Sequence, residues 1–174
     1  PLREEAEDAP LREIADARAL RGAILRANPG LAIAEVESRA KCIVAERQVR
    51  ASLELLRAAG AKVRYHALDV RDEEAFGAFI EQLYREHGRI DGVVHGAGVI
   101  EDKLLRDKSA ESFKRVYDTK VAGARALLRH LRDDVSFVAF FGSVSGAFGN
   151  RGQADYAAAN DALAQLAHAL DERI

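Results

Sequence analysis

Hydrophobic positions in the first third of the chain recur at helical spacing and are separated by charged residues. In the first such stretch the apolar residues are Leu11, Ile14, Leu20, Ile24 and Leu25. Asn28-Pro29-Gly30 interrupts this repeat, because proline and glycine disfavour continuation of a helix. A second apolar face runs from about residue 33 to residue 59, and Gly60 is a typical C-terminal stop. We therefore predict that residues 1–60 form a helical segment, or insertion, that packs on the domain that follows.

From residue 61 onward, short apolar runs alternate with amphipathic stretches. The apolar runs predict strands over residues 62–70, 90–97 and 135–141. The amphipathic stretches predict helices over residues 72–87, 109–131 and from residue 156 onward, with Asp72 and Ser109 as N-caps. Strands that alternate with helices pair in parallel, since each helical crossover brings the chain back to the end of the sheet at which the previous strand began. Residues 61–174 therefore predict an α/β fold with a partial, doubly wound parallel sheet.

Composition excludes several classes of protein. The chain has 174 residues, of which 48% are hydrophobic and 31% charged, as in ordinary globular domains. The formal net charge of −2 predicts neither a nucleic acid nor an anionic membrane as partner. No apolar run approaches the roughly 18 residues of a membrane span, and the first residues do not resemble a signal peptide. One cysteine suits the cytoplasm, and neither it nor the five histidines has metal-ligand spacing, so no metal site is predicted.

The ends of the chain suggest a piece of a larger polypeptide. The sequence contains no methionine, begins abruptly at Pro1 and stops at Ile174 inside a helical pattern. We expect further residues on both sides.

Four polar residues suggest a chemical activity. Ser143 follows the predicted strand 135–141, and Tyr156 opens an alanine-rich helix on which Asn160 lies one turn later, on the same face. Lys120 lies upstream. A hydroxyl at a strand end, facing a phenol, can polarise and protonate a carbonyl oxygen, and a nearby lysine stabilises the ionised phenol. This set favours a carbonyl reductase.

The surrounding motifs resemble those of the short-chain dehydrogenase/reductase superfamily. They are Asp69-Val70 after a strand, Gly88-Arg89-Ile90-Asp91 before the next, His95-Gly96-Ala97-Gly98 at its end, and Ser143 thirteen residues before Tyr156. Most members carry a lysine four residues after the tyrosine, whereas this chain has Asn160 there and Lys120 on the preceding helix. That exchange resembles the ketoreductase domains of modular polyketide synthases and type I fatty acid synthases. Residues 61–174 thus resemble a Rossmann-like ketoreductase catalytic domain, truncated at both ends.

The resemblance implies a role for each residue. Tyr156 would donate a proton to the carbonyl oxygen, Ser143 would hold that oxygen, Lys120 would favour the tyrosinate and Asn160 would complete the polar network. The residues implied for cofactor binding are Asp69, Val70, Gly96, Ala97, Gly98 and Lys120. A tight turn at a strand end explains the glycines alone about equally well.

The function implied is the NADPH-dependent reduction of a 3-ketoacyl thioester, carried on an acyl carrier protein, to the 3-hydroxyacyl thioester. Other synthase domains would then be partners. Ile100-Glu101-Asp102 stands where ketoreductases of one stereochemical type have Leu-Asp-Asp, which implies a D-configured 3-hydroxyl. The alternatives are a non-catalytic, Rossmann-like structural module of a synthase and a stand-alone short-chain carbonyl reductase.

One part of the expected cofactor site is missing from the sequence. Residues 1–60 contain no Gly-rich turn of the kind that holds pyrophosphate at a helix N-terminus. In the family's strand order, 3-2-1-4-5-6-7, the first two strands and the last are not found here, so the strands at 62–70 and 90–97 would not be neighbours. Either the missing strands belong to the same polypeptide, or the fragment stands alone. In the second case it would fill its gap by pairing strands with another copy, as a homo-oligomer, or by direct pairing of non-native neighbours. We expect residues 1–174 alone to be inactive.

Overall fold

The computed structural model describes residues 9–171. The chain divides into two compact units, residues 1–67 and residues 68–174, which we describe separately. Along residues 9–171, no helix is both long and apolar enough to cross a membrane.

The first unit begins with two helices where the spacing predicted one. These are α1 (Ala9–Arg12) and α2 (Ala17–Ala27). The break between them arises because Asp16 adopts an extended backbone and its side chain accepts a hydrogen bond from the N–H of Ala19 at 2.6 Å. Such an N-cap starts a new helix rather than continuing the previous one. The prediction of a single helix up to residue 28 is therefore wrong in this detail.

Helix α3 (Ile33–Ala58) confirms the second predicted helix. Its N-terminal half packs against α1 and α2 in a core formed by Leu11, Leu20, Ile24, Val36, Ala40 and Ile43. The side chain of Arg47 on α3 donates to the carbonyl oxygens of Leu11 and Ile14, each at 2.6 Å. These bonds connect α3 to the end of α1 and the turn between α1 and α2. Towards the C-terminal end the apolar face is open, since Leu55 is 72% exposed. Whether residues 1–60 pack on the following domain stays a prediction.

The second unit contains the parallel strand pair. In chain order its elements are α4 (Glu73–His87), β1 (Gly92–His95), the short 3₁₀ helix Leu105–Asp107, α5 (Ala110–His130), β2 (Phe137–Phe140), α6 (Val144–Phe148) and α7 (Ala154–Asp171). Strands β1 and β2 pair in parallel, with Gly92 opposite Phe137 and His95 opposite Phe140. The Phe137 ring lies over Gly92, where a Cβ atom would clash with it. The predicted parallel pairing is confirmed.

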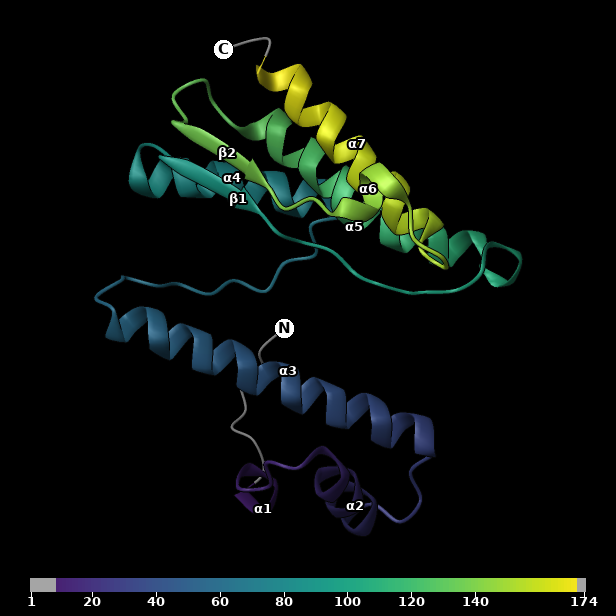
Figure 1. Ribbon diagram of the computed structural model, residues 1–174. Coiled ribbons are helices and arrows are strands. Elements are labelled where there is room, and N and C mark those ends of the chain that lie inside the picture. Colours follow the sequence, from purple (N-terminus) through teal and green to yellow (C-terminus); the bar gives the residue numbers. More distant parts are fainter. Residues whose placement is uncertain (1–8, 172–174) are drawn as a thin grey trace. The chain divides into compact units, whose positions relative to one another are not determined.

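Helices α4 and α5 pack together beside the strand pair (Figure 1). Their cluster buries Ile80, Tyr84 and Leu127 against residues that include Val93 of β1. Both helices begin at the predicted caps: the Asp72 side chain accepts from the N–H of Ala75 at 3.0 Å, and the Ser109 side chain accepts from that of Ser112 at 3.2 Å. This layer places the carboxyl ends of β1 and β2 next to α5 and α7.

The predicted strand over residues 62–70 does not form. Residues 61–69 are irregular and mostly exposed, and in the described part of the chain they pair with no other strand. A strand exists only as part of a ladder, because its backbone N–H and C=O groups need partners on a neighbour. The strands expected beside it are not found among these residues, so the apolar pattern alone does not produce a strand here.

Candidate active site

Lys120 lies beside Tyr156 in the folded chain. It projects from α5, is only 4% exposed, and places its amine 5.5 Å from the centroid of the Tyr156 ring. The amine donates to the carbonyl oxygen of Phe141 at 2.9 Å, at the end of β2. Burial lowers the pKa of Lys120, because loss of hydration disfavours the charged form. The structure therefore brings together a lysine and a phenol that lie far apart in sequence.

Asn160 lies one turn after Tyr156 on α7, as the spacing predicted. Its side-chain N–H donates to the carbonyl oxygen of Tyr156 at 2.7 Å, and the residue is 2% exposed. The side-chain oxygen of Asn160 is buried and has no hydrogen-bond partner in the described part of the chain. A buried acceptor without a partner costs free energy, which a ligand group or a water could recover.

Ser143 follows β2 and is the N-cap of the short helix α6. Its Oγ accepts from the N–H of Ser145 at 3.2 Å and from the hydroxyl of Ser145 at 2.8 Å. Because both contacts use the oxygen as acceptor, the O–H of Ser143 remains to donate to a ligand. Ser143 and Asn160 line one pocket of about 250 Å³.

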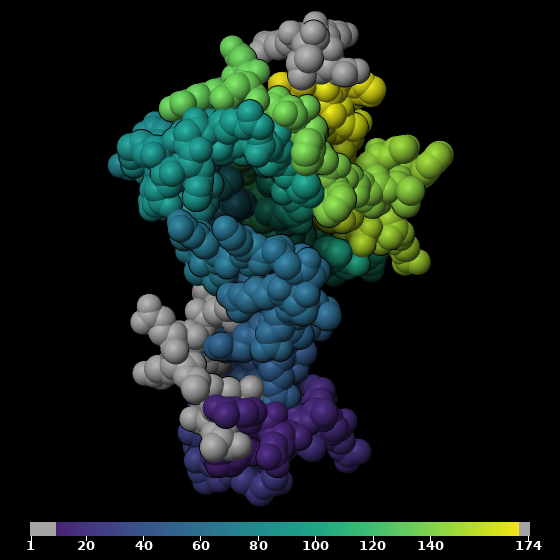
Figure 2. Space-filling view, turned by 90° about the vertical axis from the view of Figure 1, so that its left-hand side faces the viewer, coloured from purple at the N-terminus to yellow at the C-terminus, as the bar shows by residue number. Residues whose placement is uncertain are grey.

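Helix α6 stands out from its unit, as the yellow-green segment near residue 145 shows in Figure 2. Val144 is 79% exposed and Phe148 is 88% exposed. Two apolar side chains, one turn apart on α6, are thus exposed just after Ser143.

The glycine segment after β1 lies against Lys120. A Cβ atom at Gly98 would stand 3.1 Å from the Cε atom of Lys120, and one at Gly96 would stand 3.2 Å from the Phe141 ring. The Nε2 atom of His95 donates to the carbonyl oxygen of Lys120 at 2.9 Å. Burial lowers the pKa of His95, which favours the neutral ring. The His95 ring therefore supports the backbone of the residue that carries the amine.

Asp69 contacts its neighbour Arg71, and Val70 lies against α5. Arg71 donates to the Asp69 carboxylate with its backbone and side chain, and these bonds lower the pKa of Asp69 to about 2. Asp69 lines a mixed-charge pocket of about 550 Å³ between the starts of α4 and α5. Val70 packs against Gly123, where an added Cβ would stand 2.9 Å from its Cγ2 atom. Within the described residues, neither Asp69 nor Val70 contacts Tyr156.

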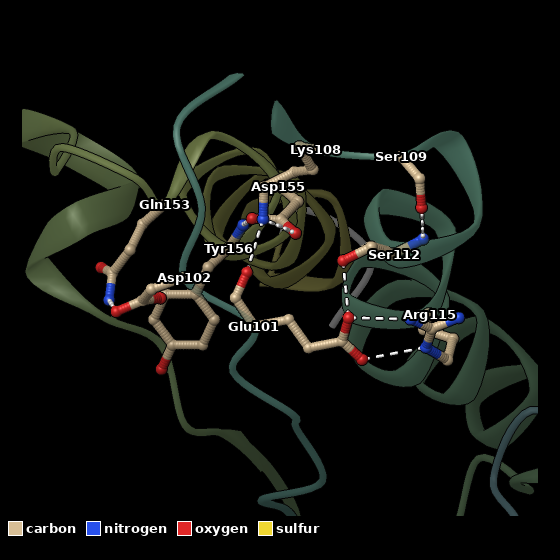
Figure 3. A network of polar contacts seen from close by, with 9 residues as sticks. All are labelled: Glu101, Asp102, Lys108, Ser109, Ser112, Arg115, Gln153, Asp155 and Tyr156. Carbon is tan, nitrogen blue, oxygen red and sulfur yellow. Dashed lines mark hydrogen bonds and ion pairs between the residues drawn. The ribbon is translucent and has the colours of Figure 1, made fainter. Parts of the chain in front are cut away.

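Sequence reasoning missed a second polar network, drawn in Figure 3. Lys108 and Asp155 form an ion pair of 2.6 Å whose side chains are each 1% exposed. Nearby, the Glu101 carboxylate accepts from Ser112 at 2.5 Å and from two nitrogens of Arg115, and these bonds lower its pKa to about 2. Asp155 directly precedes Tyr156, which was the only available signal. The pairing across 47 residues could not be inferred from spacing.

Taken together, the arrangement suits stabilisation of negative charge. A cation over the face of an aromatic ring is attracted to it, and a buried cation attracts negative charge strongly because little water screens it. Parallel strands flanked by helices, with polar side chains at their carboxyl ends, define the class of Rossmann-like α/β proteins.

The comparisons place the chain more narrowly. The family model described as the KR domain matches residues 33–173, so the chain belongs to the KR domain family, a family of oxidoreductases. The match begins at the start of α3, well before the motifs that carry the resemblance.

Related proteins agree with this assignment. The chain is 36% identical over 126 residues to a polyunsaturated fatty acid synthase protein of Thraustochytrium sp. (strain ATCC 26185 / S-3), covering 71% of this chain and 4% of that protein. It is 44% identical over 116 residues to the polyketide synthase GfsA of Streptomyces halstedii, covering 64% of this chain and 2% of that protein. A solved ketoreductase domain from the bacillaene assembly line superposes with a TM-score of 0.65 at 39% identity, covering 71% of this chain and 31% of that domain. The chain therefore spans a small part of the synthases it matches.

Proposed function

We propose that this chain carries the proton-donating half of a ketoreductase site that reduces a 3-ketoacyl thioester on an acyl carrier protein with NADPH. The observation that carries the proposal is the buried amine of Lys120 at 5.5 Å from the centroid of the Tyr156 ring. A charge buried at that place has a cost that few structural roles would require. The partners that follow are the acyl carrier protein and the other domains of a synthase.

In this proposal Tyr156 and Ser143 act on the carbonyl oxygen of the substrate, and Lys120 acts on Tyr156. Tyr156 donates its phenolic proton to that oxygen as the C=O π bond breaks. The charge of Lys120 stabilises the tyrosinate that remains, and the O–H of Ser143 donates to the same oxygen as negative charge develops on it. When bound, NADPH supplies the hydride that the carbonyl carbon accepts.

Several residues suit a nicotinamide cofactor. Gly96 and Gly98 let the segment after β1 pass close to Phe141 and Lys120, because an added Cβ at either would stand within 3.2 Å of a neighbouring side chain. We assign Gly96, Ala97, Gly98 and Lys120 to the ribose side of the cofactor. Asp69 and Val70 would meet its adenine edge.

In contrast, no motif that would bind the pyrophosphate of the cofactor is found in this sequence. Residues 1–60 contain no Gly-rich turn of the kind that opens a helix after a strand. We therefore propose that residues 1–174 by themselves neither bind NADPH tightly nor reduce a ketone. Titration of the 174-residue chain with NADPH tests this, and a dissociation constant in the micromolar range or below would contradict it.

The catalytic assignment is tested by Tyr156→Phe in the full-length protein. Reduction of a simple bicyclic ketone and of a 3-ketoacyl thioester is followed by loss of NADPH absorbance. Removal of the proton donor is expected to lower kcat about 10²- to 10⁴-fold for both substrates. Tyr117→Phe is the matched control, because Tyr117 lies on α5 and stacks on Phe113. Equal rates in Tyr156→Phe and the parent would refute the assignment.

A further inference from the structure

A buried ion pair lies directly beside the start of α7. The Nζ atom of Lys108 lies 2.6 Å from Oδ2 of Asp155, and both side chains are 1% exposed. The same Nζ donates to the carbonyl oxygen of Glu101 at 2.7 Å. The second carboxylate oxygen of Asp155, Oδ1, accepts from the backbone N–H of Tyr156 at 2.9 Å. One carboxylate thus joins a lysine to the residue that carries the phenol (Figure 3).

Stability alone is a poor explanation for this pair. Removal of two charges from water is costly, and a well-packed apolar pair of similar volume is often at least as stable. An apolar pair would fill the space but would form no directional hydrogen bonds. The two oxygens of Asp155 instead hold two partners in fixed directions, the amine of Lys108 and the N–H of Tyr156. That N–H belongs to the first turn of α7, where backbone donors have no partner within the helix.

The loop that carries Lys108 is itself tied to the residues just before α7. The N–H of Lys103 donates to the carbonyl oxygen of Gly152 at 3.0 Å, and Gln153 donates to Asp102 at 3.0 Å. Residues 101–108 therefore hold the start of α7 at three points.

The phenol faces away from this attachment. Figure 3 shows the Tyr156 hydroxyl on the far side of its ring from the Lys108–Asp155 pair. The helix start is fixed on one side of Tyr156, and the phenol oxygen lies on the other.

We propose that Lys108 and Asp155 are positioning residues that hold Tyr156 in the orientation needed for proton donation. This inference deepens the proposed function and rests on it for its kinetic consequences. Its structural consequence, the order of the Tyr156 ring, does not depend on any activity.

Two variants of the full-length protein test the proposal. Asp155→Asn removes the charge and keeps an oxygen that can accept from the Tyr156 N–H. The double variant Lys108→Met/Asp155→Leu replaces the pair by apolar side chains, which restores packing but leaves the N–H without its carboxylate. Lys114→Met is the matched control, because Lys114 also contacts an aspartate at 2.6 Å but its side chain is 77% exposed.

The first measurement is ¹⁹F NMR of protein labelled with 3-fluorotyrosine, with the Tyr156 signal assigned from Tyr156→Phe. In the double variant we expect the Tyr156 signal to shift or broaden while the signal of Tyr84, which lies in the α4–α5 core, is unchanged. We expect a smaller change in Asp155→Asn and none in Lys114→Met. The second measurement is ketone reduction, in which the double variant is expected to lose at least about tenfold in kcat with KM within about twofold.

The outcomes separate positioning from a purely structural role. Recovery of both folded stability and kcat in the double variant, with an unchanged Tyr156 signal, would overturn the proposal. Failure of both variants to fold would overturn it too, since the pair would then hold the fold rather than the tyrosine. If Tyr156→Phe keeps full activity, the proposed function fails, yet the ¹⁹F signals still decide whether the pair orders the Tyr156 ring.

Discussion

Gly146 brings α6 close to α7 beside the candidate site, and Gly146→Ala tests that approach. A Cβ atom there would stand 3.0 Å from each of three atoms: the backbone carbon of Asn160, its Cβ atom and the backbone nitrogen of Asp161. These atoms belong to α7 and cannot rotate away as the end of a long side chain can. The methyl group must therefore push the two helices apart.

The expected magnitude follows from two opposing effects. Overpacking of a closely packed contact costs about 1–3 kcal/mol. Alanine in place of glycine inside a helix raises the free energy of unfolding by about 0.5–1 kcal/mol. With the middle of each range, we expect a net loss of about 1 kcal/mol in the free energy of unfolding. Because Asn160 is one of the displaced residues, its hydrogen bond to the Tyr156 carbonyl should also weaken.

Hydrogen exchange of α7 amides in the full-length protein measures this effect, because it reports the opening of α7 separately from residues 1–67. Gly142→Ala is the matched control: Gly142 lines the same pocket, and an added Cβ there would meet nothing within 4 Å. We expect its effect to stay within about 0.5 kcal/mol. Protection of α7 in Gly146→Ala that equals or exceeds that of the parent would refute the steric argument.

Three further predictions concern charge and stereochemistry. The Glu101 carboxylate should titrate near pH 2 in ¹³C NMR, and Arg115→Gln should raise its pKa. The stability that the Glu101–Arg115 contact adds is present above pH 4.5 and is lost as pH falls towards 2. A titration midpoint of Glu101 near 4.5 in the parent protein would contradict this prediction. In NMR titration of labelled lysine, the amine of Lys120 should lose its proton below the usual pKa of 10.5. The folded state therefore gains stability as pH rises from the lowered pKa of the folded state to that of the unfolded chain. A titration midpoint at or above 10.5 would contradict the effect of burial. Chiral analysis of the reduced thioester should give the D-configured 3-hydroxyl, and Asp102→Ala should lower that preference; an L-configured product from the parent would exclude the role assigned to this loop.

Much of the fold was predictable because its signals are local. Apolar spacing and capping residues predicted α4 and α5 with their caps Asp72 and Ser109, and the strand–helix alternation predicted the parallel pairing of β1 with β2. The strand expected over residues 62–70 failed for a non-local reason. Its pattern is suitable, but strand formation needs a hydrogen-bonded neighbour that these residues do not contain.

The sequence by itself determined which residue types stand on which element. The interval of four between Tyr156 and Asn160 ensures a shared helix face, and the motifs around them identify the KR domain family that the comparisons confirm. Only the tertiary structure decided which of these residues meet across the fold. The approach of Lys120 to Tyr156 depends on how α5 packs on α7. The burial of Lys108 against Asp155 depends on how the loop before α5 meets the start of α7. Residue spacing along one helix follows from its geometry, whereas contacts between elements follow from packing, which no single stretch of sequence specifies.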